Sequence, residues 1–271
     1  MILFPFAKVN IGLEVLRKRS DSFHDLETIF YPLNLCDILE MNKSDAFHFS
    51  ISGLQIGDSS EKNIVEKAYW LLQSEYNLQP VHIHLHKQIP TGAGLGGGSS
   101  DAAFTLLGIN ELFHLKLNER QLINYASKLG SDCAFFIIKK PIYAEGKGNI
   151  FSESSVNLKD YSLVLIKPAL SVSTSVAYRG VEPKVPEYSL KESVKLPIEL
   201  WKERIQNRFE KGIFYSFPQI KLIKERLYSE GALYASMSGS GSSVYGIFDV
   251  IPPQLRIQFP DCFYWEENCR F

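Results

Sequence analysis

The chain has 271 residues, of which 45% are hydrophobic, so it is long enough to form one large domain or two modest ones with a full apolar core. Its formal net charge of −1 at pH 7 does not indicate a nucleic-acid-binding protein, and no apolar run is long enough to span a membrane. The four cysteines (Cys36, Cys133, Cys262 and Cys269) form no Cys-x-x-Cys pair, which is typical of reduced thiols in a cytoplasmic protein.

The first elements follow from hydrophobic periodicity. Residues 6–15 alternate between an apolar face and a second face that carries Lys8 and Asn10, which predicts a strand. Residues 64–72 have apolar side chains at helical spacing, and residues 81–87 alternate again, with three histidines on one side. Because no cysteine or acidic cluster is nearby to complete a metal site, we interpret these histidines as a polar strand face.

The later elements are predicted from the same helical and strand periodicities. In order, they are helices over 99–113 and 118–129, strands over 135–138 and 162–166, a helix over 218–230 and a strand over 244–248. Residues 152–197 are irregular and rich in Ser, Pro and Lys, so we expect a domain boundary near their start, between domains 1–150 and 151–271. This mixture predicts an α+β protein rather than a strict βαβ alternation.

Residues 90–101, Pro-Thr-Gly-Ala-Gly-Leu-Gly-Gly-Gly-Ser-Ser-Asp, are the most biased segment of the chain. Glycines let a backbone approach a ligand closely, and a helix that starts at Ser99–Asp101 aims unpaired N–H groups at the loop. The segment therefore predicts an anion site, above all for phosphate. No lysine follows the last glycine, so this is not a Walker A loop, and the position late in the chain does not fit a dinucleotide-binding fold.

Three other segments carry candidate chemistry. Lys8 lies in an otherwise apolar strand, where a lysine needs a partner unless the strand face is solvent-exposed. Asp132 is the best candidate for the partner carboxylate, although an aspartate just before an apolar run is often a turn or cap residue. Residues 17–24 form a charged turn that is either a solvated loop or, through Phe23 and His24, a place to stack on and hydrogen-bond a planar base.

Together these segments resemble the GHMP kinase superfamily, which includes galactokinase, homoserine kinase and mevalonate kinase. Residues 90–100 are similar to its phosphate loop, Pro-x-x-x-Gly-Leu-Gly-Ser-Ser, and residues 237–243 to its third, glycine-rich motif. Five segments narrow the resemblance to members whose acceptor alcohol carries a cytidine diphosphate group. They are the tripled glycine at 96–98 and the segments at 7–10, 19–24, 129–132 and 144–146.

The resemblance implies a two-domain GHMP kinase fold, with a ribosomal-S5 domain 2-like N-terminal domain and a ferredoxin-like C-terminal domain. It implies an ATP-dependent kinase of the non-mevalonate isoprenoid pathway that acts on a small cytidine diphosphate substrate, with Mg²⁺ as cofactor and no nucleic-acid or membrane partner. The ATP-binding residues that it implies are Pro90, Thr91, Gly92, Ala93, Gly94, Leu95, Gly96, Gly97, Gly98, Ser99 and Ser100.

The resemblance also assigns roles to single residues. Lys8 and Asp132 are the implied catalytic pair: Asp132 orients the acceptor hydroxyl and accepts its proton, and Lys8 keeps Asp132 ionised. The implied substrate-binding residues are Asn10, Phe23, His24 and Tyr178. Among these, His24 hydrogen-bonds the cytosine, and the two aromatic side chains stack on it from opposite sides.

The sequence departs from the family pattern in the substrate region, where Ser22 replaces a usual glycine and Phe23 a usual tyrosine, and Arg208 interrupts an Asn-Asp-x-Glu stretch. Two alternatives stay open. One is another small-molecule kinase of the superfamily, of the homoserine or mevalonate kinase type, whose small acceptor needs no pair like Phe23 and His24. The other is a non-catalytic nucleotide-sensing relative, which need not retain Lys8, Asp132 and both glycine-rich loops.

Overall fold

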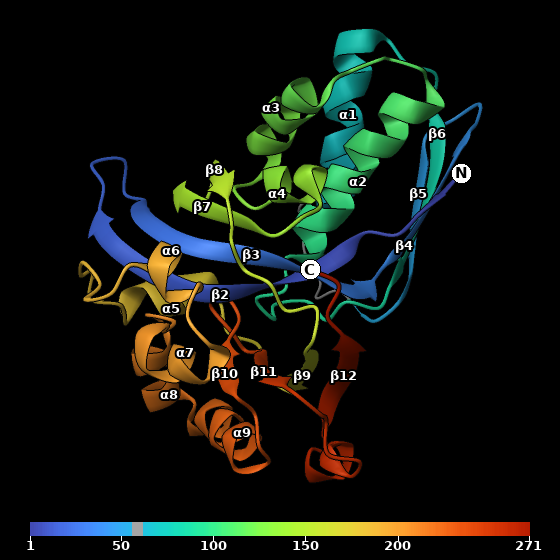
Figure 1. The fold of residues 1–271 in the computed structure, drawn as a ribbon. Coiled ribbons are helices and arrows are strands. Elements are labelled where there is room, and N and C mark those ends of the chain that lie inside the picture. The colour runs from blue at the N-terminus through green and yellow to red at the C-terminus, as the bar shows by residue number, and fades with distance from the viewer. Residues whose placement is uncertain (56–61) are drawn as a thin grey trace. The chain divides into compact units, whose positions relative to one another are not determined.

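The computed structural model describes residues 1–55 and 62–271, which pack into two compact units that interleave along the chain (Figure 1). Unit 1 comprises Met1–Ala7, Asn34–Thr91 and Gly96–Lys139, and unit 2 comprises Lys8–Leu33, Gly92–Leu95 and Lys140–Phe271. The glycine-rich loop therefore passes from unit 1 into unit 2 and back. These packing units are a different division from the expected domains 1–150 and 151–271, which stay a prediction.

The described sheet of unit 1 has the strand order β1, β4, β6, β5. The bounds of these strands are Ile2–Leu3, Ile38–Lys43, Val81–Lys87 and His48–Gly53. β4 runs antiparallel to β6 and β5 runs parallel to it, so β6 is held by a neighbour on each side. The position of its last residue, Lys87, after which the chain enters the glycine-rich loop, is therefore fixed.

Four helices lie in the described part of unit 1: α1 (Ile64–Tyr76), α2 (Gly97–Leu112), α3 (Glu119–Leu129) and α4 (Cys133–Ile138). α3 confirms the helix predicted over 118–129: a capping box of Asn118 and Gln121 starts it, and Gly130 is its C-cap residue. α2 packs against α1, α3 and α4 and against β4 (Figure 1). The helix that follows the glycine-rich loop is therefore supported on several sides.

The strand predicted over residues 135–138 is wrong, because these residues belong to helix α4. A short apolar run has no visible period, so its sequence does not distinguish a strand from a buried helix. Here every side chain from Cys133 to Ile137 is buried, and Phe135 and Phe136 pack on Phe6 with ring centroids 6.0 and 5.3 Å away. Burial on all sides removes the polar face that marks an amphipathic helix.

The start of α2 also differs from the prediction, since the helix begins at Gly97 and not at Ser99–Asp101. Gly96 precedes it with φ +71°, in the left-handed region that favours glycine. This conformation turns the chain into the helix early, so that Ser99 and Ser100 lie within the first turn. No side chain caps the helix start.

Strand β6 has the predicted bounds, and its histidines lie on a polar strand face. His84 hydrogen-bonds Ser50 Oγ at 2.8 Å and Ser52 Oγ at 2.9 Å through its two ring nitrogens. Within residues 1–55 and 62–271, no group of three or more His, Cys, Asp and Glu side chains is placed to hold a metal ion.

A second sheet has the order β2, β3, β7, β8, with bounds Phe6–Lys18, His24–Cys36, Ile142–Gly146 and Ile150–Glu153. β2 contains the predicted strand and is longer than expected at its C-terminal end. Residues 7–15 are all buried, so both faces of β2 are covered. The solvent-exposed alternative for Lys8 and Asn10 is thereby wrong, and each needs a polar partner inside the protein.

The third sheet has the order β10, β11, β9, β12, and every pairing in it is antiparallel (Figure 1). Its strands are β9 (Ser162–Pro168), β10 (Tyr234–Met237), β11 (Val244–Phe248) and β12 (Cys262–Asn268). Taken by sequence, the spatial order is second, third, first, fourth, as in a ferredoxin-like split β-α-β sheet. The predicted strands at 162–166 and 244–248 are confirmed.

The helical elements of unit 2 are α5 (Thr174–Arg179), α6 (Leu190–Ser193), η1 (Ile198–Leu200), α7 (Trp201–Arg204), α8 (Glu210–Ser216), α9 (Pro218–Ser229) and η2 (Leu255–Gln258). α9 confirms the helix predicted from Pro218 and packs against β10 and β11. The buried faces of α9 and of the sheet meet in one apolar core, to which Ile220, Leu227 and Phe248 contribute.

One cluster of charges is buried in unit 1. Lys87 Nζ contacts Asp37 Oδ2 and lies 2.7 Å from Asp101 Oδ2, and all three side chains are at most 3% exposed. Burial raises the pKa of the Asp101 carboxyl, and this effect outweighs the opposite effect of the Lys87 ammonium. The protonated form of Asp101 is therefore favoured by folding.

We expect Asp101→Asn to remove a pH dependence of stability. An unfolded aspartate has a pKa of about 4 and loses its proton before the folded one, so Asp101 lowers the free energy of unfolding as the pH rises above about 4. The variant should therefore gain stability relative to the wild type between about pH 5 and pH 7.5, by at most about 1.4 kcal/mol per pH unit. Urea unfolding at both pH values measures this, and a pH-independent difference contradicts it.

Candidate functional site

The glycine-rich loop combines left-handed backbone positions with free helical N–H groups. Gly92, Gly94 and Gly96 have φ values of +59°, +73° and +71°. The first helical hydrogen bond of α2 runs from Ser100 N to Gly96 O at 2.9 Å, so the N–H groups of residues 97–99 precede it and have no acceptor within the helix. This arrangement suits an anion, because the N–H groups and the positive end of the helix dipole point the same way.

Gly94 is the most crowded position in the loop. A Cβ atom there would lie 2.0 Å from the carbonyl oxygen of Ser238, which belongs to the second glycine-rich loop. The Gly94 carbonyl oxygen accepts a hydrogen bond from Lys8 Nζ at 3.0 Å and another from Ser238 Oγ at 2.8 Å. The two glycine-rich loops are therefore in direct contact within unit 2. The Gly94 carbonyl oxygen connects Lys8 to the second loop, because it accepts hydrogen bonds from both Lys8 and Ser238.

Lys8 is oriented by a chain of buried polar contacts. Its side chain is buried, and its Nζ donates to Asn10 Oδ1 at 2.6 Å and lies 5.3 Å from the ring centroid of Phe30. Asn10 Nδ2 donates to Thr28 Oγ1 at 2.9 Å, and Thr28 Oγ1 donates to the carbonyl of Gly12 at 2.6 Å. Asn10 therefore uses both ends of its amide inside the protein, which fits a role in holding Lys8.

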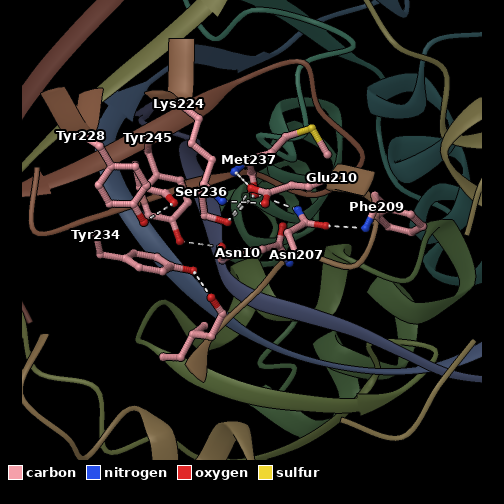
Figure 2. A network of polar contacts seen from close by, with 12 residues as sticks. Asn10, Asn207, Phe209, Glu210, Lys224, Tyr228, Tyr234, Ser236, Met237 and Tyr245 are labelled. Atoms are coloured by element: carbon pink, nitrogen blue, oxygen red, sulfur yellow. Dashed lines mark hydrogen bonds and ion pairs between the residues drawn. The ribbon is translucent and has the colours of Figure 1, made fainter. Parts of the chain in front are cut away.

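Figure 2 shows the polar network that supports the second glycine-rich loop, residues 237–243. Asn207 Nδ2 donates to the carbonyl oxygens of Met237 at 2.7 Å and Gly239 at 2.8 Å. Glu210 Oε1 accepts from Met237 N at 2.8 Å, and its Oε2 pairs with Lys224 Nζ at 2.6 Å. Neither Asn207 nor Glu210 had a role predicted from the sequence, because their partial match to a family stretch was the only local signal.

Arg208, which interrupts that stretch, has a partner of its own. Its guanidinium group lies 2.5 Å from Glu14 Oε2, and the Glu14 side chain is 6% exposed. Burial raises the pKa of Glu14, and the ion pair with Arg208 acts in the opposite direction. The residue that departs from the family pattern, Arg208, therefore forms an ion pair with Glu14 of β2.

Asp132 lies in unit 1, at the start of α4. It occupies the N-cap position and is half-buried, but its side chain makes no capping hydrogen bond, so capping is not its role. The thiol of the next residue, Cys133, hydrogen-bonds with Ser99 in the first turn of α2, and burial raises the pKa of this thiol to about 12. The start of α4 is thereby held next to the end of the glycine-rich loop.

Lys8 and Asp132 belong to different units, so the contacts of each are described within its own unit. Lys8 contacts Gly94 in unit 2, and the start of α4, with Asp132, contacts Ser99 in unit 1. An ion pair between Lys8 and Asp132 stays a prediction.

Three aromatic rings of unit 2 pack in series. The rings of His24 and Tyr178 are stacked, with centroids 4.8 Å apart and an interplanar angle of 23°. Tyr178 in turn meets Phe209 edge-on at 4.9 Å. Burial lowers the pKa of His24, assisted by the positive charge of Lys18, so the ring is neutral at pH 7 and has one donor and one acceptor nitrogen.

Phe23 lies in the turn before His24 and is 54% exposed. Lys147 Nζ lies 4.0 Å from its ring centroid and 2.9 Å from Asp21 Oδ2. Ser22 has φ +67°, so the turn keeps a glycine-like conformation although a serine occupies it, at a cost of roughly 1–2 kcal/mol. The structure stacks Tyr178 on His24, and the binding of cytosine between Phe23 and Tyr178 stays a prediction.

Comparison with known proteins fits this geometry. Family models match at residues 63–140 (GHMP kinases N terminal domain) and 190–254 (GHMP kinases C terminal). A 4-diphosphocytidyl-2-C-methyl-D-erythritol kinase of Bacteroides fragilis (strain YCH46) is 49% identical over 274 residues, which is 100% of both chains. Its counterpart in Bacteroides thetaiotaomicron is 53% identical over 253 residues, 92% of each chain. The chain belongs to the GHMP kinase family.

A solved structure supports the same conclusion for the fold. The crystal structure of a 4-(cytidine 5'-diphospho)-2C-methyl-D-erythritol kinase has a TM-score of 0.81 and 29% sequence identity, and the match covers 98% of each chain. The predicted α+β GHMP kinase fold is thereby confirmed. The two matched domains contain both glycine-rich loops and Asp132, whereas Lys8 and His24 precede them and are covered by the full-length relatives. No described helix of this GHMP kinase meets the length and hydropathy that a membrane crossing requires.

Two glycines of the loop offer a matched test of its packing. Gly94→Ala forces a left-handed alanine against the Ser238 carbonyl oxygen, so we expect it to lower the free energy of unfolding by more than about 2 kcal/mol. Gly98→Ala lies in α2, where the new Cβ meets only Ile64 Cγ2 at 3.8 Å, and it should raise the stability by about 0.5–1 kcal/mol. Urea unfolding of both variants measures this, and equal effects contradict the contact between the loops.

Proposed function

We propose that this GHMP kinase transfers the γ-phosphoryl group of ATP to the 2-hydroxyl of 4-diphosphocytidyl-2-C-methyl-D-erythritol, a step of the non-mevalonate isoprenoid pathway. The observation that carries the proposal is the ammonium group of Lys8, buried and held 3.0 Å from the Gly94 carbonyl of the glycine-rich loop. The names of relatives that are about half identical over the full length support the same substrate. None of the four cysteines forms a disulfide bond, which supports the expected cytoplasmic location.

The donor site is the loop from Pro90 to Ser100. Its N–H groups and the start of α2 bind the phosphates of ATP, and the glycines leave room for the phosphate oxygens close to the backbone. Lys8, fixed by Asn10 and Gly94, stabilises the negative charge on the transferred group. Since these groups are already in place, little reorganisation is needed when the charge develops.

Asp132 is the proposed partner of the acceptor hydroxyl. Its carboxylate accepts the hydroxyl proton while the oxygen forms a bond to the γ-phosphorus, and the bond to the bridging oxygen breaks to release ADP. Lys8 favours the ionised form of this carboxylate by its opposite charge. One observation supports this role: the adjacent Cys133 contacts Ser99 of the loop.

Mg²⁺ is the proposed companion of ATP. The described residues include no cluster of three or more potential ligands among His, Cys, Asp and Glu, but Mg²⁺ in nucleotide sites is bound largely by phosphates and water. Hydroxyl oxygens suit this hard cation, and Ser100 Oγ is buried without a hydrogen-bond partner in the described part of the chain. Ser99 and Ser100 are therefore the residues that would hold it, and the ion would supply charge neutralisation between the phosphates.

His24, Phe23 and Tyr178 form the proposed cytidine site. The neutral imidazole of His24 has both a donor and an acceptor for the polar edge of cytosine. Phe23 and Tyr178 offer ring faces for stacking, and Tyr178 is braced edge-on by Phe209. A homoserine or mevalonate kinase type of acceptor has no base to use these rings, which disfavours that alternative.

The catalytic assignment has a direct test. Asp132→Asn keeps the shape of the side chain but cannot accept a proton, so we expect turnover with ATP and the cytidine substrate to fall by roughly 10²–10⁴-fold. Lys8→Ala should also reduce turnover, and the double variant should be little worse than either single one, because the two groups act as a unit. Steady-state assays of ADP release measure this. Asp45→Asn, an exposed position, is the control, and near-normal turnover of Asp132→Asn rejects the assignment.

The cytidine site has a separate test. We expect Phe23→Ala to weaken binding of the cytidine substrate by about 1–3 kcal/mol, the range for lost base stacking, with ATP affinity unchanged. His24→Ala should act in the same direction, because it leaves polar edges of the base without partners. Phe4→Ala is a matched control, since Phe4 is 57% exposed and Phe23 54%. Calorimetric titration with each ligand decides; loss of ATP binding alone would mean that this pocket is misassigned.

A further inference from the structure

The buried cluster of Lys87, Asp37 and Asp101 meets the chain at both ends of the glycine-rich loop. Lys87 is the last residue of β6, from which the chain enters the loop, and Asp101 lies in α2, where the chain leaves it. Asp37, between β3 and β4, supplies the third side chain. All three side chains belong to unit 1, and none of them has a role in the proposed reaction.

The entry to the loop is fixed by Asp37. Its Oδ1 accepts hydrogen bonds from the backbone N–H groups of Gln88 at 2.6 Å and Ile89 at 2.8 Å, the two residues before Pro90. Its Oδ2 contacts Lys87 Nζ, so one carboxylate binds three consecutive residues. The backbone of Asp37 is itself anchored, because its N–H donates to the carbonyl of Pro5 at 2.8 Å.

The exit from the loop is fixed by the same ammonium group. Lys87 Nζ lies 2.7 Å from Asp101 Oδ2, one turn into α2. A Cβ atom on Gly97, the first residue of α2, would lie 3.4 Å from Lys87 Nζ and 3.0 Å from Ile89 Cγ2. The first turn of α2 therefore packs directly on the end of β6 and on the ammonium group.

We propose that the Lys87–Asp37–Asp101 cluster is a positioning device for ATP, which sets the spacing between the two ends of the phosphate-binding loop and so aims the N–H groups of residues 97–99. The inference rests on the proposed function of the loop as the ATP site. Simple stabilisation does not explain the cluster well, because apolar residues in place of a buried ion pair are often equally stable. A fixed spacing, in contrast, requires directional contacts at both ends.

The test compares three variants of α2 in the full-length protein. Asp101→Ala removes the acceptor that α2 offers to Lys87 Nζ and should raise the dissociation constant for ATP by about tenfold, with the affinity for the cytidine substrate changed less than about twofold. Asp101→Asn keeps an oxygen acceptor at the same place and should restore ATP affinity to within about twofold of the wild type. Thr105→Val, one turn further along, removes a buried hydrogen bond of 2.7 Å to the Asp101 carbonyl and controls for general weakening of α2.

Calorimetric titration with ATP alone, and with the cytidine substrate alone, gives each affinity, and urea unfolding confirms that each variant is folded. A folded Asp101→Ala protein that binds ATP normally overturns the inference. So does a Thr105→Val protein that loses as much ATP affinity as Asp101→Ala, because a structural role alone predicts that result. If Asp101→Ala does not fold, Asp101→Ser, whose side chain is one bond too short to reach Lys87 Nζ, replaces it under the same criteria. A wild-type protein that fails to bind ATP instead rejects the proposed function of the loop.

Discussion

The carbonyl group of Gly94 is the point on which the site in unit 2 depends. A carbonyl oxygen has two lone pairs, and here one hydrogen bond comes from the Lys8 ammonium and the other from the Ser238 hydroxyl. The missing side chain of Gly94 lets the backbone of the second loop approach to a distance that no other residue permits. A shift of this one peptide would move a buried charge and the second loop together.

Each polar group of this site is held by another that is also buried. Lys8 hydrogen-bonds Asn10, Asn10 hydrogen-bonds Thr28, and Thr28 donates to a backbone carbonyl of β2. Asn207 and Glu210 hold the second loop in the same way (Figure 2). Buried polar groups without partners are costly, so such a series has few alternative arrangements. The protein thereby fixes the direction of its charges before any substrate binds, which is the main requirement of phosphoryl transfer.

The parts of the fold that could be predicted from the sequence are those that leave a local mark. Gly94 and Gly96 stand out because left-handed backbone needs glycine, and Asn118 with Gln121 because a capping box is a short-range pattern. Helix α4 could not be predicted, since burial on all sides erases its period. Asn207 and the buried Lys87 cluster act on backbone distant in sequence, and only the fold reveals such contacts.

The interleaving of the two units has a consequence for how the chain is made. Unit 2 combines Lys8–Leu33 with Lys140–Phe271, so β2 and most of β3 leave the ribosome long before the strands that complete their sheet. During this interval the apolar side chains at alternate positions of residues 7–15, which are buried in the finished protein, are exposed to solvent. Such early exposure favours aggregation, and contacts between distant segments slow folding.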